Sequence, residues 1–487
     1  MTSIPSSDAG GTPTKKTSSE QVGPRLRIPH IYVVLFLFSA IAAIATHLMP
    51  ASRYDRVDLP SGREAIDPDT YSLVPSTPVG LVDFMTAIPR GLIAASDVVF
   101  FTFLIGGMFM VLRETGIIEC LIDRLARLVS RRRLLVVPAL MLTFSAIATL
   151  IGTQELALVY VPVILPLVIA LRFDSITAAA IALCATTAGF TSGVLNPINT
   201  GLGQQIAGLE PFSGIPLRAA LWACLTVVGI AYVSRYAHRV ATNPASGLMA
   251  EEPNEISKRE RYVHADTGTP MQLNKRQRIG AWVLLGFFAV LVWGVLDQGW
   301  FFIEMSGLFI AMGIVVGLIS GLTPTRICEA FDSGMRDVLV GAIIVGVARS
   351  VAIVLEDGQV MDTLVHSLGE VVGLLPGWLA AVGMLVSQSL FNLVVPSGSG
   401  QALVTMPIMA PLSDLIGVTR QTAVLAYQLG DGLSNILYPT SGYFMATLAL
   451  AGVRYDRWIR FFLPLFAFWF VIALTFCIIA QAIGWTG

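Results

Sequence analysis

Three ionisable side chains lie inside apolar stretches of the sequence, namely Glu155, Arg349 and Asp431. On insertion scales, a charge at the centre of a bilayer costs at least about 2.5–3.5 kcal/mol, so such a group persists only with a partner, an ion or a substrate. A carboxylate at that depth can bind a cationic substrate, Na⁺ or a proton. Arg349 could form a structural salt bridge or bind a substrate carboxylate, and the sequence favours neither interpretation.

Four short segments combine glycine or proline with polar side chains. Two are predicted hairpin tips, Gly152–Glu155 and Pro396–Gln401, and two are predicted helix breaks, Gly189–Gly201 and Gly430–Gly442. Non-helical backbone inside a membrane must be buried in protein or line a wet cavity. Its free helix N-termini suit anions and its C-terminal ends suit cations. We therefore predict a substrate or ion site that contains Gly152, Thr153, Glu155, Asn196, Asn199, Thr200, Ser397, Gly398, Ser399, Asp431, Asn435, Thr440 and Ser441.

The alternative is that these glycines and prolines only permit close packing, as they often do in membrane helices. Single serine and threonine hydroxyls can also simply bond the preceding helical turn. One such segment would leave the two interpretations equal. Four of them, placed symmetrically and accompanied by asparagine, serine and threonine, favour a binding site.

The composition indicates an integral membrane protein. Of the 487 residues, 55% are hydrophobic and 13% are charged, and the mean hydropathy is +0.73. Charged residues make up about 25% of ordinary soluble domains. Two apolar stretches, Leu134–Leu171 and Trp378–Ile416, are interrupted midway. A span needs about 20 mostly apolar residues, and the candidate spans are Ile31–Met49, Val98–Leu112, Ile176–Ser192, Leu217–Ser234, Ile279–Leu296, Ile303–Gly321, Val338–Leu355, Thr419–Ile436 and Phe461–Ile483.

The distribution of lysine and arginine predicts the topology. Basic residues gather in the N-terminal tail and in Arg113–Arg133, Arg235–Arg278 and Arg454–Arg460, which the positive-inside rule places in the cytoplasm. The first interrupted stretch then enters and leaves from the cytoplasm, and the second does so from outside. Re-entrant hairpins satisfy this arrangement, although two full spans would also do so. A cleaved signal peptide is the alternative for Ile31–Met49, but the run exceeds a signal core of about 7–15 residues.

The two interrupted stretches also resemble each other. Pro162 and Pro166 match Pro407 and Pro411 in spacing, and a predicted helix break follows each pair. Weak internal symmetry with opposite topology is typical of secondary transporters, whereas chance similarity of two apolar segments is the alternative. We predict an all-α polytopic protein with two inverted repeats, each containing a re-entrant helical hairpin and a broken transmembrane helix. Its parts are a disordered cytoplasmic tail at 1–29, a first repeat at 30–234, a cytoplasmic linker at 235–278, and a linking helix with the second repeat at 279–487.

Several classes of function find no support in the sequence. The five cysteines show no metal-ligand spacing, no glycine–lysine motif could cradle a phosphate, and no Ser/His/Asp constellation appears. We therefore expect no catalytic residue, no metal, no cofactor and no nucleic-acid partner. A membrane-embedded enzyme or an assembly factor is a less favoured alternative to a transporter.

Four segments carry a resemblance to a known family: Asn196–Gly208, Pro211–Gly214, Pro396–Ala402 and Asp431–Asn435. They resemble the anaerobic C4-dicarboxylate carrier family, and most closely a branch named for the antiport of basic amino acids. The resemblance extends over nearly the whole chain except the polar N-terminal tail. It implies the ion transporter superfamily fold, a homodimer with a fixed scaffold and a mobile transport domain. The second tip reads Ser397-Gly-Ser-Gly rather than the Ser-Asn-Thr of dicarboxylate-transporting relatives, which weakens a dicarboxylate substrate.

These observations together predict a secondary transporter of the inner membrane with a cytoplasmic N-terminus. We expect an antiporter or an ion-coupled symporter of small charged metabolites, working by elevator-type alternating access. Basic amino acids such as arginine or ornithine are the favoured substrates, because both Glu155 and Asp431 would repel a dianion. A C4-dicarboxylate remains the alternative if the two acids serve a coupling ion, either a proton or Na⁺.

Overall fold

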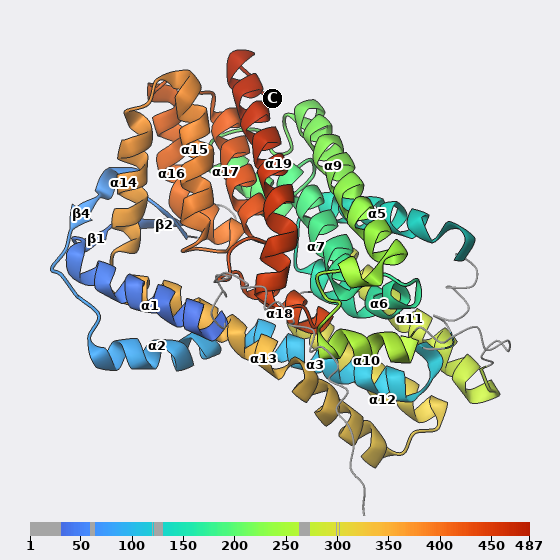
Figure 1. The fold of residues 1–487 in the computed structure, drawn as a ribbon. Coiled ribbons are helices and arrows are strands. Elements are labelled where there is room, and N and C mark those ends of the chain that lie inside the picture. Colours follow the sequence, from blue (N-terminus) through green and yellow to red (C-terminus); the bar gives the residue numbers. More distant parts are fainter. Residues whose placement is uncertain are drawn as a thin grey trace, which may run out of the picture.

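The computed structural model describes residues 31–58, 64–118, 120, 130–262, 273–298, 300 and 302–487. The predicted cytoplasmic tail at 1–29 lies outside the described residues. Helices dominate the described part, in agreement with the predicted all-α class (Figure 1). Six of these helices are long and apolar enough to cross a membrane, or seven if the bent helix Pro324–Asp357 counts as one span.

One group of helices forms a layer that we call the scaffold (Figure 1). Within it, α13 packs along α3, α2 and α1, while α12 packs between α3 and α11. Apolar side chains such as Trp282 and Ile303 remain exposed on its surface, as expected for a face covered by lipid. The scaffold consists of α1 (Ile31–Leu48), α2 (Leu81–Ala94), α3 (Ser96–Glu114), α11 (Lys275–Asp297), α12 (Phe302–Ser320) and α13 (Pro324–Asp357).

A second group, which we call the hairpin block, lies over the scaffold (Figure 1). Its central helix α7 is buried along its whole length, because its side chains are small or apolar and neighbours cover it on every side. The block consists of α5 (Val136–Ile151), α6 (Leu156–Ala170), α7 (Ser175–Ser192), α8 (Leu202–Ile206), α9 (Ile215–Thr242), α15 (Gly377–Asn392), α16 (Gly398–Leu415), α17 (Arg420–Ser434), α18 (Gly442–Ala451) and α19 (Tyr455–Ala482).

Both interrupted stretches form pairs of helices joined by a short tip. In the first hairpin, α5 ends at Gly152, whose φ of +76° only glycine adopts easily, and α6 begins at Leu156. Phe144 of α5 stacks on Tyr160 of α6 with ring centroids 3.9 Å apart. In the second hairpin, α15 ends at Asn392 and α16 begins after Ser397, which caps it. The first tip thus lies at the predicted segment Gly152–Glu155, whereas the second tip covers residues 393–397, and Gly398–Gln401 of the predicted tip belong to the first turn of α16.

Both predicted breaks interrupt a helix, although they begin later than the glycines suggested. The first break runs from Gly193 to Gly201 and includes a π-helical turn at Pro197–Gly201. The second break covers residues 435–441, between α17 and α18. Gly189 and Gly430 remain helical. Glycine is needed at both positions because a Cβ would collide with the backbone of the neighbouring hairpin.

The polar segment between α1 and α2 forms two small antiparallel ribbons. β1 (Ser52–Arg53) pairs with β4 (Ser72–Leu73), and β2 (Arg56–Asp58) pairs with β3 (Glu64–Ile66). The ribbons attach to α14 (Met361–Gly373) because Arg56 forms a 3.1 Å ion pair with Asp362. They stay minor additions to a helical fold.

Part of the predicted linker is folded onto the hairpin block. Helix α9 continues to Thr242, and α10 (Pro253–Tyr262) follows a 3₁₀ turn at Pro244–Ser246. Lys258 Nζ donates to Ala451 O at 2.6 Å and to Ser175 Oγ at 2.9 Å, and Glu255 accepts from the Ser175 backbone N at 3.1 Å. Burial lowers the pKa of Lys258, and nearby Glu255 opposes that shift. This part of the linker therefore belongs structurally to the hairpin block.

Candidate substrate and ion site

Asp431 lies at the centre of the candidate site. Its side chain is fully buried at the end of α17. Asn435 Nδ2 donates to Asp431 Oδ1 at 3.1 Å, and Asn199 Nδ2 donates to Asp431 Oδ2 at 3.2 Å. The carboxylate therefore joins the two helix breaks, which are far apart in the sequence. Within the described part, no lysine or arginine forms an ion pair with it.

The second hairpin tip sits directly on this carboxylate. A Cβ at Gly398 would overlap Asn199 Nδ2 and would lie 2.7 Å from Asp431 Oδ2. Tyr427 of α17 donates its hydroxyl to Gly398 O at 2.6 Å. Only glycine therefore allows the start of α16 to approach so closely. The half-buried Ser399 follows in the first turn of this helix.

The first hairpin tip reaches the same region from the other side. Gly152 lies against Asn196, whose Oδ1 a Cβ at Gly152 would overlap. The side chain of Asn196 in turn accepts from the Asn199 backbone N at 3.0 Å. Thr153 donates its hydroxyl to the carboxylate of Glu155. Glu155 is half-buried and lies within electrostatic range of Asp431, so the site contains two neighbouring acids.

The remaining predicted residues lie around this centre. Thr200 is buried in the first break beside Gly193, and Thr440 and Ser441 are buried in the second break. The hydroxyls of Thr200 and Thr440 have no hydrogen-bond partner within the described residues. Contacts thus join one residue of each tip and residues of both breaks into one cluster, namely Gly152, Asn196, Asn199, Gly398, Asp431 and Asn435. Thr440 and Ser441 lie further along the second break, and Ser397 is exposed at the second tip.

Arg349 lies outside that centre. Its Nη2 is 3.5 Å from Glu356 Oε1, and its side chain lines a cavity of about 500 Å³. This outer cavity is bounded by the ribbons, by α13 and by the second hairpin tip; its charged and polar walls include Arg53, Arg56, Arg349, Glu356, Asp362 and Ser397. The cavity connects the exposed edge of the site with the side predicted to be extracellular.

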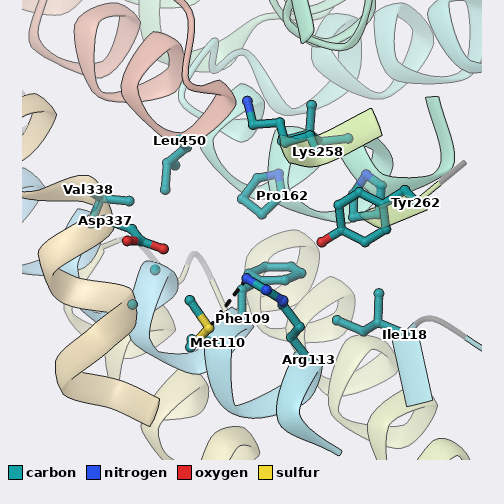
Figure 2. Close-up of a pocket in the computed structure, with 14 residues that line it drawn as sticks. Phe109, Met110, Arg113, Ile118, Pro162, Lys258, Tyr262, Asp337, Val338 and Leu450 are labelled. Carbon is teal, nitrogen blue, oxygen red and sulfur yellow. Dashed lines mark hydrogen bonds between the residues drawn. The ribbon is translucent and has the colours of Figure 1, made fainter. Parts of the chain in front are cut away.

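A smaller cavity of about 190 Å³ lies between the first hairpin and the scaffold (Figure 2). Pro162 of α6 and Lys258 of α10 face Arg113 and Asp337 of the scaffold across it (Figure 2). Arg113 contacts the Met110 sulfur at 3.6 Å. On the side of the first hairpin, this inner cavity is lined by α6 through Pro162, Leu165 and Pro166, and its lining does not include the tip residues Gly152–Glu155. The outer cavity, in contrast, is lined by Ser397 of the second tip.

Five residues of this region were not among those predicted. Asn392 Nδ2 donates to Asp431 O at 3.0 Å, and Gln154 Nε2 donates to Gly432 O at 2.9 Å. Gln154 lies within the predicted tip Gly152–Glu155, and Asn392 is an amide in the apolar run that precedes the predicted tip Pro396–Gln401. Gln428 Nε2 donates to Phe190 O, and the Tyr443 hydroxyl donates to Gln154 Oε1. Arg218 is fully buried beside the first break.

Comparison with known proteins identifies the family. Residues 28–482 match the model of the C4-dicarboxylate anaerobic carrier, DcuC. The Escherichia coli (strain K12) protein named "Putative basic amino acid antiporter YfcC" is 31% identical over 506 residues, which cover 95% of this chain and 98% of that protein. An "Uncharacterized protein" of Haemophilus influenzae (strain ATCC 51907 / DSM 11121 / KW20 / Rd) is 31% identical over 82% of this chain and 78% of its own.

Two solved structures show a distant likeness. Neisseria gonorrhoeae MtrF, described with a class of antimetabolite efflux pumps, aligns with a TM-score of 0.41 and 17% identity over 93% of this chain and 95% of its own. The Alcanivorax borkumensis YdaH transporter, described as having an unusual topology, aligns with a TM-score of 0.41 and 18% identity, covering 94% and 99%. The family model and the relative aligned along nearly the full length decide the assignment: this multi-pass membrane protein belongs to the C4-dicarboxylate anaerobic carrier family of transporters.

Proposed function

We propose that the protein is an antiporter of basic amino acids such as arginine and ornithine. The observation that supports this most directly is the charge of the site. Asp431 and Glu155 lie close together, and within the described residues neither is paired with a lysine or an arginine. A buried carboxylate needs a cation or a proton. The side-chain cation of a basic amino acid would meet that need.

The same site offers donors for the other end of such a substrate. Helix α16 begins at Gly398 beside Asp431, so its first backbone N–H groups point toward the site. These groups and the hydroxyl of Ser397 suit a carboxylate. A zwitterion with a cationic side chain would therefore bridge Asp431 and the start of the second hairpin. Exchange follows if a second cationic substrate, a proton or Na⁺ must replace the first one at Asp431.

The division into scaffold and hairpin block supports an elevator-type movement. The whole candidate site belongs to the hairpin block, and the scaffold faces it mainly through α13 against α18. At that contact, a Cβ at Gly442 would lie 2.8 Å from Val345 Cγ1, so a small residue keeps the surfaces close. We place this protein in the inner membrane as a homodimer, with its N-terminus in the cytoplasm. Membership of a carrier family favours transport over the enzyme or assembly-factor alternative.

A C4-dicarboxylate substrate is the second candidate, and one structural observation favours it. Arg53, Arg56 and Arg349 line the outer cavity together with two acids, Glu356 and Asp362. The three arginines outnumber the acids, which would favour an approaching anion. The dianion would then have to bind next to Asp431 with that carboxylate protonated or occupied by Na⁺.

Exchange in proteoliposomes distinguishes the two substrates. Vesicles loaded with unlabelled arginine should take up labelled ornithine, and empty vesicles should not. Excess external arginine should block this uptake, whereas excess succinate or fumarate should leave it unchanged. Uptake of labelled succinate that arginine does not inhibit would replace the amino-acid proposal with the dicarboxylate one.

A further inference from the structure

Arg218 is a buried cation that the proposed transport site does not use. It lies in the first turn of α9 and is fully inaccessible to solvent. Its Nη2 is 3.4 Å from Gln421 Oε1, and its guanidinium lies 5.4 Å from the centre of the Trp485 ring. Within the described part of the chain, no carboxylate pairs with it, and its Nε and Nη1 have no hydrogen-bond partner. Because arginine stays protonated in proteins, the charge is permanent.

The position of this guanidinium explains why a charge is kept there. Helix α7 ends at Gly193, the left-handed residue that opens the first break. A Cβ built on Gly193 would lie 3.2 Å from Arg218 Nη1, so the guanidinium lies at the carbonyl end of α7. This end carries partial negative charge, and a cation there is favourable. In transporters with broken helices, such carbonyl ends are also where coupling cations are coordinated.

The equivalent end of α17 has the opposite arrangement. There Asp431 adds a full negative charge, and the neighbouring groups are the amides of Asn199, Asn392 and Asn435. No arginine or lysine of the described chain is bonded at that end. One helix end therefore contains a cation that belongs to the protein, whereas the other contains a carboxylate that needs an external cation.

We propose that Arg218 takes the place of a coupling cation at the first break. It holds a fixed positive charge at the end of α7, so the carbonyl groups of this helix end bind no exchangeable ion. The cation bound at Asp431 is then the exchangeable one. A carrier built in this way can exchange one cation for another without a second ion at the first break. The inference does not depend on which substrate Asp431 binds.

Three substitutions at this position separate charge from shape. R218K keeps the positive charge, R218Q replaces it with an amide whose oxygen can coordinate Na⁺, and R218M is apolar and of comparable length. The full-length protein is purified in lipid nanodiscs, and its thermal unfolding is followed in NaCl and in choline chloride at equal ionic strength. Wild type and R218K should show the same difference in unfolding temperature between the two salts, which is the contribution of any cation at Asp431. R218Q should unfold earlier in choline and recover in Na⁺ with a saturable dose dependence, and R218M should not recover.

Several results would overturn the proposal. R218Q could match wild type in choline, or could fail to recover in Na⁺, including a failure to be isolated in NaCl buffers. Wild type could show a Na⁺ response as large as that of R218Q, which would mean that removing the guanidinium creates no ion site at the first break. A loss of wild-type stability when chloride is replaced by gluconate would show instead that the guanidinium holds an anion.

Discussion

The two helix breaks differ in backbone conformation, since the first contains a π-helical turn, and opposite charges lie beside them. Each follows a buried helix and contains asparagine, and a tip glycine lies near each: Gly152 against Asn196, and Gly398 against Asp431 at the end of α17. Among the described residues, Arg218 provides the full charge at the helix end before the first break, and Asp431, which Asn199 of the first break also contacts, provides it at the helix end before the second. Two similar helix ends therefore differ through single side chains, which decide the charge at each end. At the first helix end the protein's own Arg218 supplies the positive charge, whereas at the second Asp431 needs a cation from outside the protein.

The sharpest test of this comparison asks whether the two halves face opposite sides of the membrane. Ser257 on α10 and Ser367 on α14 are both exposed helical serines, so S257C and S367C are matched single-cysteine variants in a background without the native cysteines. The distribution of basic residues predicts all-or-none results. A membrane-impermeant maleimide added to intact cells should label S367C and not S257C. Labelling of both variants from outside would contradict the prediction that the two halves are inverted relative to each other.

The charge at the second break is tested by D431N. The variant keeps the shape of the side chain and removes the negative charge that would hold a cationic substrate. Loss of one partner of a buried charge pair costs about 2–5 kcal/mol, so substrate affinity should fall by about 30-fold or more. Isothermal titration with arginine measures the change. E155Q is the comparison, and we expect a smaller loss because Glu155 is half-buried. Equal affinity of D431N and wild type would remove Asp431 from the site.

The close approach of the second tip is tested by G398A. The added methyl group would overlap Asn199 Nδ2, so α16 must move away from Asp431. Overpacking of this kind costs about 1–3 kcal/mol, and transport should fall roughly 10-fold. G307A in α12 is the matched control, because a Cβ at Gly307 meets no atom within 4 Å. Proteoliposome uptake at equal protein density compares the two, and unchanged uptake by G398A would contradict the packing described here.

The attachment of the first tip should give the smallest effect. Gln154 bonds Gly432 O at 2.9 Å and Thr187 at 3.1 Å, and it accepts from Tyr443 at 2.8 Å. Q154A leaves these buried groups without a partner, which costs about 1–3 kcal/mol of stability. Y443F removes one of the bonds and should cost less. Thermal unfolding in nanodiscs gives the order, and a Y443F variant less stable than Q154A would assign Tyr443 another role.

Much of this architecture could be predicted because glycine, proline and polar residues stand out in apolar sequence. Each predicted span corresponds to most of one helix, and the first tip, Gly152–Glu155, lies between α5 and α6 as expected. The sequence predicts breaks that begin at Gly189 and Gly430, because glycine often ends a helix, but the helices continue to Ser192 and Ser434. In the structure these glycines permit close contact with the hairpins while the helices continue. A glycine in a single sequence does not distinguish these two roles.

The charge on the first break could not be predicted for a different reason. Arg218 stands at the edge of an apolar run, where a basic residue usually marks the membrane surface. Its side chain is long enough to extend inward from the first turn of α9 to the end of α7. Arg349 shows the converse, since it lies within an apolar run but its side chain reaches Glu356 and the outer cavity. Long side chains separate a residue's place in the sequence from the place of its charge.

Helix α10 has a mechanical consequence. Glu255 and Lys258 fasten it to Ser175 and to the end of α18, so in the proposed elevator movement it would move with the hairpin block. The chain from Tyr262 to Lys275 connects this helix to α11 of the scaffold. The twelve residues between Tyr262 and Lys275, with thirteen Cα–Cα steps, reach at most about 45 Å when fully extended. In the proposed movement this length would set an upper limit on the displacement of the block, so that insertions or deletions there would change the limit without touching the binding site.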